Sequence, residues 1–177
     1  MVPPEDLKIY GGVDWKKFMG LETKPTPPNC DMNMLYRASL LCINIHTLRQ
    51  KRRHIQLNDR TFNISAAGGF QICDNPLVRD YFSEDEIVCA DNDNEYIEKV
   101  DFFLKCPEAT LPFAEASFQR TYRDHSYFNR IAALYENLGI SAPFGLVMNV
   151  GNLFICPPIR CPLFLLFITL SMQRRPG

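Results

Sequence analysis

The chain has 177 residues, which is the length of one ordinary domain and short for two. Hydrophobic residues make up 46% and charged residues 22% of the sequence, which excludes wholesale disorder and a polytopic membrane protein. The formal net charge is -1, and the one basic cluster, residues 49–54, is more typical of a solvated loop than of a binding patch, so we expect no nucleic-acid partner.

Seven cysteines are scattered along the chain and form no C-x-x-C pair. Cys42, Cys73 and Cys89 fall inside apolar, strand-like runs, where a free thiol packs as a small core residue. This usage fits a reducing compartment. The first residues show no basic region followed by an apolar stretch, as a signal peptide would require. We therefore expect a cytoplasmic protein.

The first third of the chain alternates strand-like and helical stretches. Residues 7–10 predict a strand, and the prolines of residues 24–29 predict a connector. Asp31 is a candidate cap for a helix that continues to about residue 39. The apolar run 40–45 then predicts a buried strand, which delivers His46 into a loop.

The next stretch, residues 58–75, mixes polar, small and glycine residues. Asn58 or Asp59 can cap a short helix over about residues 61–67, and Gly68 can end that helix in a left-handed conformation. Residues 70–73 predict a strand that ends at Asp74. The stretch therefore predicts a helix followed directly by a strand.

The alternation continues to about residue 138. The expected elements are a helix at 75–82, a strand at 86–90 and helices at 94–105 and 111–138, the last two with apolar stripes at helical spacing. Strands that alternate with helices predict parallel pairing with right-handed crossovers. The sequence therefore predicts an α/β fold, a Rossmann-like parallel sheet flanked by helices.

Residues 141–177 differ from the rest because they contain no Asp, Glu or Lys. Their uninterrupted apolar run, residues 163–170, is far shorter than the roughly 20 residues that span a bilayer as a helix. The abrupt change favours an atypical tail appended to a domain of residues 1–140. A docking or membrane-surface segment and an ordinary part of the core are the alternatives.

In an open parallel sheet, ligands bind outside the carboxyl ends of the strands. A helix that begins near Arg60 adds free backbone N–H groups and a positive dipole end, which suit a phosphate or diphosphate. The other residues expected at this edge are Gly11, Gly12, His46, Thr47, Asp74, Asn75 and Asp91.

Ordered sequence blocks carry a resemblance to a known family over about residues 7–138. The blocks are 35–39 (LYRAS), 44–46 (NIH), 58–63 (NDRTFN), 66–70 (AAGGF) with Asp74, and 122–127 (YRDHSY) with Arg130. Together they resemble the C-terminal, donor-binding domain of group-one type glycosyltransferases with the GT-B fold. The spore-maturation protein B-like subgroup is the most similar.

The resemblance implies a hexosyltransferase-like enzyme that binds a nucleotide-diphosphate sugar and transfers its sugar to an unknown acceptor, without a metal or a separate cofactor. It also implies a preceding N-terminal domain that holds most of the acceptor site and the catalytic base. We expect this chain to lack that domain and to be incomplete for catalysis on its own, so the catalytic residues are unassigned. A non-catalytic or degenerate binding module of the same fold is the alternative.

The resemblance also implies a set of donor-binding residues. In the family an acidic side chain in the corresponding helix accepts hydrogen bonds from the donor ribose, and that position is Asn63 here. Asn63 keeps a carbonyl acceptor but loses the charge. The expected donor-binding residues are His46, Arg60, Thr61, Asn63, Gly68, Gly69 and Asp74.

Structural alternatives exist for most of these residues. Arg60 can instead form a surface ion pair with Asp59 or Asp74, and asparagine is common at helix N-termini, which is a packing role for Asn63. His46 can be a satisfied loop histidine. The two glycines favour a helix stop and a close backbone approach over ligand contact. His125, which lies among aromatic residues, is expected to be structural.

Overall fold

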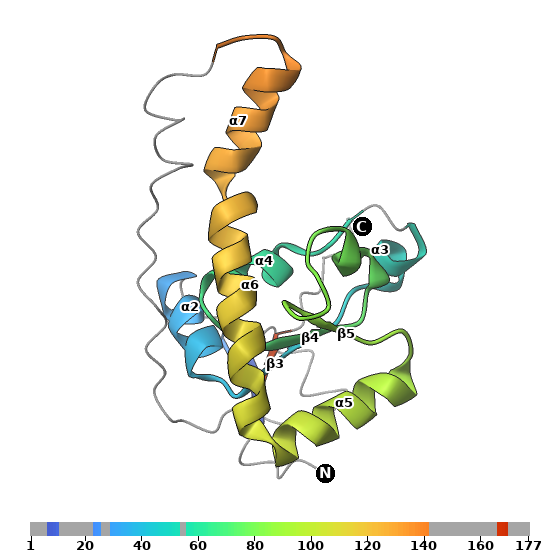
Figure 1. Cartoon of the computed structure of the whole chain (residues 1–177). Coiled ribbons are helices and arrows are strands. Elements are labelled where there is room, and N and C mark those ends of the chain that lie inside the picture. The colour runs from blue at the N-terminus through green and yellow to red at the C-terminus, as the bar shows by residue number, and fades with distance from the viewer. Residues whose placement is uncertain (1–6, 11–22, 26–28, 54–55, 142–165, 170–177) are drawn as a thin grey trace.

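The computed structural model describes residues 7–10, 23–25, 29–53, 56–141 and 166–169 (Figure 1). Its strands are β1 (Leu7–Tyr10), β2 (Thr23–Lys24), β3 (Leu41–Asn44), β4 (Gln71–Cys73), β5 (Val88–Cys89) and β6 (Leu166–Thr169). Its α-helices are α2 (Asn29–Ala38), α3 (Leu48–Arg53), α4 (Asp59–Ala66), α5 (Asp93–Lys105), α6 (Thr110–Asp124) and α7 (Tyr127–Asn137). Two short 3-10 helices are η1 (Pro76–Asp80) and η2 (Pro107–Ala109).

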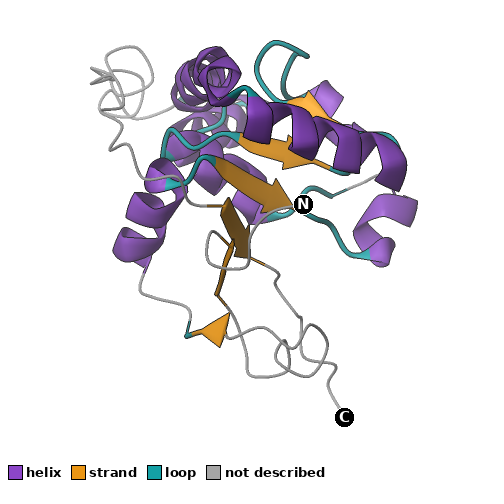
Figure 2. Ribbon diagram, turned by 90° about the horizontal axis from the view of Figure 1, so that it is seen from below, coloured by secondary structure: helices purple, strands orange, loops and turns teal. Residues whose placement is uncertain are grey.

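The strands form one six-stranded sheet in the order β2-β1-β6-β3-β4-β5, and the neighbouring strands are parallel. The strands lie as a twisted layer with helices packed against them (Figure 2). In the register, Ile72 of β4 lies beside Ile43 of β3 and Val88 of β5. The predicted α/β class, a parallel sheet flanked by helices, is confirmed.

Side chains of the strands alternate between two buried layers, as the pleat of a strand requires. Leu41, Ile72 and Val88 face one layer, where they pack with Phe103 of α5 and Phe70. Phe70 and Phe103 are in ring contact, with their centroids 4.5 Å apart. The sheet is therefore covered by α5 and the first turns of α6 on this side.

The opposite layer contains the smaller strand residues. Cys42 packs with Met32 and Tyr36 of α2 and with Ile64 of α4. The cysteines predicted to be core residues, Cys42, Cys73 and Cys89, are buried and form no disulfide with one another. Both faces of the sheet are thus occupied, and α4 lies over the face that carries Cys42.

Helix α4 has a defined beginning and end. The side chain of Asn58 accepts a hydrogen bond from the backbone N–H of Thr61 and caps the helix, as its sequence position predicts. Gly68 follows the helix with a φ of 74°, the left-handed conformation that glycine adopts without strain. A Cβ atom on Gly69 would lie 2.8 Å from the carbonyl oxygen of Tyr36. Gly68 and Gly69 therefore stop the helix and allow α2 to approach closely.

The basic cluster forms helix α3, so the prediction of a solvated loop is wrong there. Thr47 and Gln50 cap this helix reciprocally: the Gln50 N–H donates to Thr47 Oγ1 at 3.3 Å, and the Thr47 N–H donates to Gln50 Oε1 at 3.0 Å. The sequence signal is the Thr-x-x-Gln spacing, which the charge of the cluster obscured.

The predicted continuous helix 111–138 is divided into α6 and α7. His125 ends α6, and Ser126 caps α7 by accepting a hydrogen bond from the N–H of Asn129. Figure 1 shows the two helices end to end, with α7 projecting beyond the sheet. Because it projects, α7 has no buried residue. None of the helices in the described ranges is long and apolar enough to cross a membrane.

Part of the predicted tail belongs to the sheet. Strand β6, residues 166–169, pairs with β1 on one side and with β3 on the other. An uncharged apolar run suits a central strand of a parallel sheet. The division into a domain of residues 1–140 and an atypical tail of residues 141–177 stays a prediction. Residues 142–165 and 170–177 of the tail lie outside the described part.

Candidate functional site

The carboxyl ends of β3 and β4 carry polar side chains beneath the N-terminus of α4. Asn44 is completely buried, and its Nδ2 atom donates to Thr61 Oγ1 at 2.9 Å and to Gln71 Oε1 at 2.8 Å. Asn58 donates to Asn44 Oδ1 at 2.8 Å, and Gln71 donates to the hydroxyl of Ser65 at 2.9 Å. This buried network fixes the first turns of α4 to the edge of the sheet.

Asp74 lies just beyond β4 and receives three hydrogen bonds. The backbone N–H of His46 donates to Asp74 Oδ1 at 2.8 Å, and His46 Nδ1 lies 2.8 Å from the same oxygen. Lys51 Nζ of α3 donates to Asp74 Oδ2 at 3.0 Å. Burial alone would raise the pKa of the Asp74 carboxyl, but the hydrogen bonds from His46 and Lys51 hold that pKa below its ordinary value.

His46 is held by this carboxylate and is only 4% exposed. Because an ionised carboxylate accepts hydrogen bonds, Nδ1 of His46 carries the proton of the His46–Asp74 bond. The other ring nitrogen, Nε2, is buried and has no hydrogen-bond partner among the described residues. The imidazole therefore has one fixed nitrogen and one nitrogen with unused bonding capacity.

Arg60 is in the first turn of α4 and is only 8% exposed. Its Nη1 atom is buried without a hydrogen-bond partner, and none of the ion pairs among the described residues includes it. Burial lowers the pKa of its guanidinium, and the nearby Tyr36, Cys42 and Asp74 partly offset that effect. The predicted alternative, a surface ion pair with Asp59 or Asp74, is therefore not formed.

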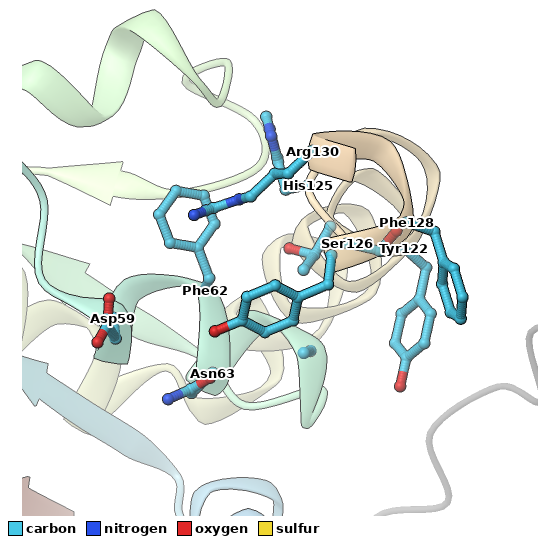
Figure 3. A pocket seen from close by; sticks show the side chains of 11 residues that line it. Asp59, Phe62, Asn63, Tyr122, His125, Ser126, Phe128 and Arg130 are labelled. Atoms are coloured by element: carbon cyan, nitrogen blue, oxygen red, sulfur yellow. The ribbon is translucent and has the colours of Figure 1, made fainter. Parts of the chain in front are cut away.

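Asn63 is on the opposite, solvent-facing side of α4. With Asp59 and Phe62 it lines a cavity of about 500 Å³ between α4 and the junction of α6 and α7. Figure 3 shows Phe62 and Asn63 projecting from α4, and Arg130 extending from α7 toward the ring of Phe62. The Arg130 guanidinium carbon lies 5.0 Å from the centre of that ring. The cavity thus lies on one side of α4. The carboxyl edge of the sheet that carries His46, Arg60 and Asp74, called the Arg60 edge below, lies on the other side.

Comparison with protein families gives a match to the model described as "Glycosyl transferase-like", over residues 2–136. This range contains the edge residues and most of the described domain. The chain belongs to the glycosyl transferase-like family. Neither the curated proteins nor the solved structures gave a match to it.

The glycosyl transferase-like domain brings together only some of the residues predicted to bind the donor. His46, Arg60 and Asp74 lie at the carboxyl edge of the sheet, and Asp74 contacts His46 directly. Thr61 is also there, but its N–H and hydroxyl are used within the buried network. Asn63 lines the neighbouring cavity.

Gly68 and Gly69 are separated from these residues because they follow the other end of α4. They are buried, and their contacts are those of a helix stop packed on α2. Three other edge residues have local partners: Thr47 caps α3, Asn75 caps η1, and Asp91 pairs with Arg79. Gly11 and Gly12 lie outside the described residues.

Several residues of the edge were not predicted. Asn44 ends β3, and Gln71 begins β4 and reaches Asn44 from below the edge. Both are polar residues within apolar strands, a signal that could have found them but not their pairing. Lys51 was grouped with the basic cluster, although it contacts Asp74. In the described part of the domain, no group of three or more His, Cys, Asp or Glu side chains is arranged to hold a metal ion.

Proposed function

We propose that the carboxyl edge formed by Arg60, His46 and the N-terminus of α4 binds the diphosphate of a nucleotide-sugar donor. The observation that carries this proposal is the buried Nη1 atom of Arg60, which has no partner among the described residues. A buried guanidinium without a counter-ion is costly, and an anionic ligand offsets that cost. Guanidinium groups suit phosphates because they present parallel N–H donors.

Helix α4 supports the same ligand. The first backbone N–H groups of an α-helix have no partner within the helix, and the dipole makes this end positive. The Asn58 side chain accepts from the N–H of Thr61 at this helix. In this proposal the N–H groups of Asp59 and Arg60, for which the described residues show no side-chain cap, bind the ligand. A phosphate above this turn would receive backbone and guanidinium hydrogen bonds together.

His46 adds a third donor or acceptor to the proposed site. The Asp74 carboxylate fixes the ring through Nδ1, so the orientation of Nε2 is set before a ligand arrives. In this proposal Nε2 hydrogen-bonds a phosphate oxygen. Asp74 contacts the donor only through His46, so it is a positioning residue.

The proposed reaction is the transfer of the sugar from the donor to the acceptor. The bond between the anomeric carbon of the sugar and the diphosphate oxygen breaks, and the nucleoside diphosphate leaves with the bonding electrons. The acceptor oxygen bonds to the anomeric carbon, and its proton passes to a base that the resemblance assigns to a preceding N-terminal domain. Arg60 stabilises the charge that develops on the leaving group. The donor-binding, C-terminal position and the spore-maturation subgroup are parts of this proposal.

A non-catalytic binding module is the second candidate, and Asn63 is the observation that favours it. In the proposed site Asn63 accepts a hydrogen bond from a ribose hydroxyl, but the bond lacks the charge that a glutamate would supply. Both candidates bind the nucleotide. Turnover by the protein, measured as release of nucleoside diphosphate from a nucleotide sugar, separates them.

Calorimetric titration with UDP, GDP and ADP tests the site. We expect one of them to bind, and we expect Arg60→Ala to weaken that binding by about 10- to 100-fold, the usual value of hydrogen bonds to a charged group. Arg60→Lys should recover only part of the affinity. Arg79→Ala is the control, because Arg79 is a more exposed arginine paired with Asp91. Equal binding by the Arg60→Ala and wild-type proteins would contradict the proposal.

A further inference from the structure

The cavity on the solvent-facing side of α4 is built from two kinds of side chain. Its volume of about 500 Å³ is within the range of small-molecule sites. Aromatic rings line it from three elements: Phe62 of α4, Tyr122 of α6, and Tyr127 and Phe128 of α7. Tyr127 is 82% exposed and Phe128 is 42% exposed. Exposed rings gathered at one cavity are typical of a binding site.

The ring of Phe62 is held in place by its neighbours. Arg130 covers one side at 5.0 Å, and His125 contacts Phe62 with ring centres 5.5 Å apart. His125 is itself fixed, because its Nε2 atom lies 2.9 Å from the carbonyl oxygen of Tyr81. The aromatic wall is therefore formed before a ligand binds.

A polar group in the same wall has unused bonding capacity. Thr121 is only 5% exposed, and its hydroxyl has no hydrogen-bond partner among the described residues. A buried hydroxyl without a hydrogen-bond partner is unfavourable unless a ligand or a water molecule forms that hydrogen bond. Ser126 lines the cavity as well, and its hydroxyl, which donates to Asn129 Oδ1 and accepts from the Asn129 N–H, can accept one further hydrogen bond.

The charges around the cavity cancel. Asp59 and Arg130 are the acidic and the basic residue of the lining. His125 adds no charge near neutral pH, because burial lowers its pKa below the ordinary value. The cavity therefore differs from the Arg60 edge, which favours an anion.

We propose that this cavity binds a neutral saccharide. The apolar faces of sugar rings pack on Phe62 and Tyr127, and the sugar hydroxyls hydrogen-bond Thr121 and Ser126. The volume fits one or two sugar units. If the Arg60 edge binds the donor as proposed above, the saccharide here belongs to the acceptor, since the two sites flank the same helix.

Saturation-transfer NMR with free cellobiose and N,N′-diacetylchitobiose tests the cavity without any nucleotide. We expect at least one of these disaccharides to bind. Tyr127→Ala should weaken that binding about tenfold or more, because it removes an exposed aromatic surface. Tyr135→Ala is the matched control, since Tyr135 is on α7 but does not line the cavity. No binding of either disaccharide at 20 mM overturns the proposal.

Thr121→Val separates ligand binding from folding. Valine has the shape of threonine without its hydroxyl, so the variant should fold at least as stably as the wild type. We expect it to lose about fivefold to tenfold in disaccharide affinity. Unchanged affinity for the disaccharide overturns the assignment of the cavity.

Two further measurements distinguish this cavity from the donor site. Arg60→Ala should leave disaccharide binding unchanged, and Tyr127→Ala should leave nucleoside diphosphate binding unchanged. Displacement of the disaccharide by a nucleoside diphosphate would overturn the saccharide proposal and make the cavity part of the nucleotide site. Failure of the donor site alone would appear as loss of nucleotide binding with disaccharide binding intact.

Discussion

At the scale of single residues, Asn63 distinguishes this chain from the family pattern that it resembles. Replacing it with glutamate restores a charge-assisted bond, which is roughly twice as strong as a neutral one. We expect Asn63→Glu to raise the affinity for the bound nucleoside diphosphate by about fivefold, and Asn63→Ala to lower it by a similar factor. Calorimetric titration of the three proteins measures both effects. A glutamate variant that binds more weakly than wild type would show that Asn63 does not contact the ribose.

Asp74 gives a prediction about pH. Its pKa is lower in the folded protein than in the unfolded chain, so its contribution to stability is complete above about pH 4, the unfolded value, and is lost as the pH falls through the folded pKa. We expect Asp74→Asn to reduce the free energy of unfolding by about 1–3 kcal/mol at pH 7, because its partners His46 and Lys51 lose a charged acceptor.

Urea unfolding at pH 7 and at pH 3 measures this effect. The difference between the wild type and Asp74→Asn should shrink at pH 3. Asp91→Asn is the control, since Asp91 forms an exposed ion pair with Arg79 and should change stability little. A difference that is equal at both pH values would contradict the role given to Asp74.

At the scale of elements, Asn58 connects α4 to the sheet. Its side chain caps the helix and also donates to the buried Asn44. We expect Asn58→Ala to lower the free energy of unfolding by about 2–3 kcal/mol, because it removes a cap and leaves a buried acceptor unsatisfied. Asn92→Ala, at the start of α5, removes an exposed cap alone and should cost about 1 kcal/mol.

Chemical denaturation of the two asparagine variants gives the comparison. Similar losses in both would mean that the contact with Asn44 adds nothing to the cap. A larger loss in Asn58→Ala, together with weaker nucleotide binding, supports the view that the buried network positions the N-terminus of α4. The network thus connects folding with the proposed site.

The elements show what the sequence could predict and what it could not. Caps and stops were found where the signal is local, as at Asn58 and Gly68. Helix α3 was not predicted, because the charge of residues 49–54 was taken to indicate a loop and the Thr-x-x-Gln spacing that caps the helix was not used. The pairing of Asn44 with Gln71 depends on strand register, which no local pattern records. Gly68 and Gly69 entered the predicted site through the family resemblance, while their own pattern predicted the helix stop and close approach that the structure shows.

At the scale of the whole molecule, the strand order was the main feature that the sequence could not supply. The alternation of strands and helices predicted the parallel α/β class, but it carries no information on strand order. Strand β6 lies between β1 and β3, and the composition of its apolar run did not indicate that position. The cavity was also not foreseen, because it depends on the division of the predicted helix 111–138 at His125 and Ser126.

Truncation tests the position of β6. A chain that ends at residue 141 loses β6, which leaves β1 without its connection to β3. We expect this chain to unfold at a lower urea concentration than the full chain, because a central strand of a parallel sheet is buried on both faces. An unchanged midpoint would show that the tail adds nothing to the stability of the domain.

The central claim is that this glycosyl transferase-like domain recognises a diphosphate through Arg60. The most direct measurement is the gain in affinity from a nucleoside monophosphate to the nucleoside diphosphate of the same base, determined by calorimetry for the wild type and for Arg60→Ala. We predict a gain of about tenfold or more in the wild type and little gain in the variant. The same gain in both proteins, or no gain in the wild type, would contradict the account.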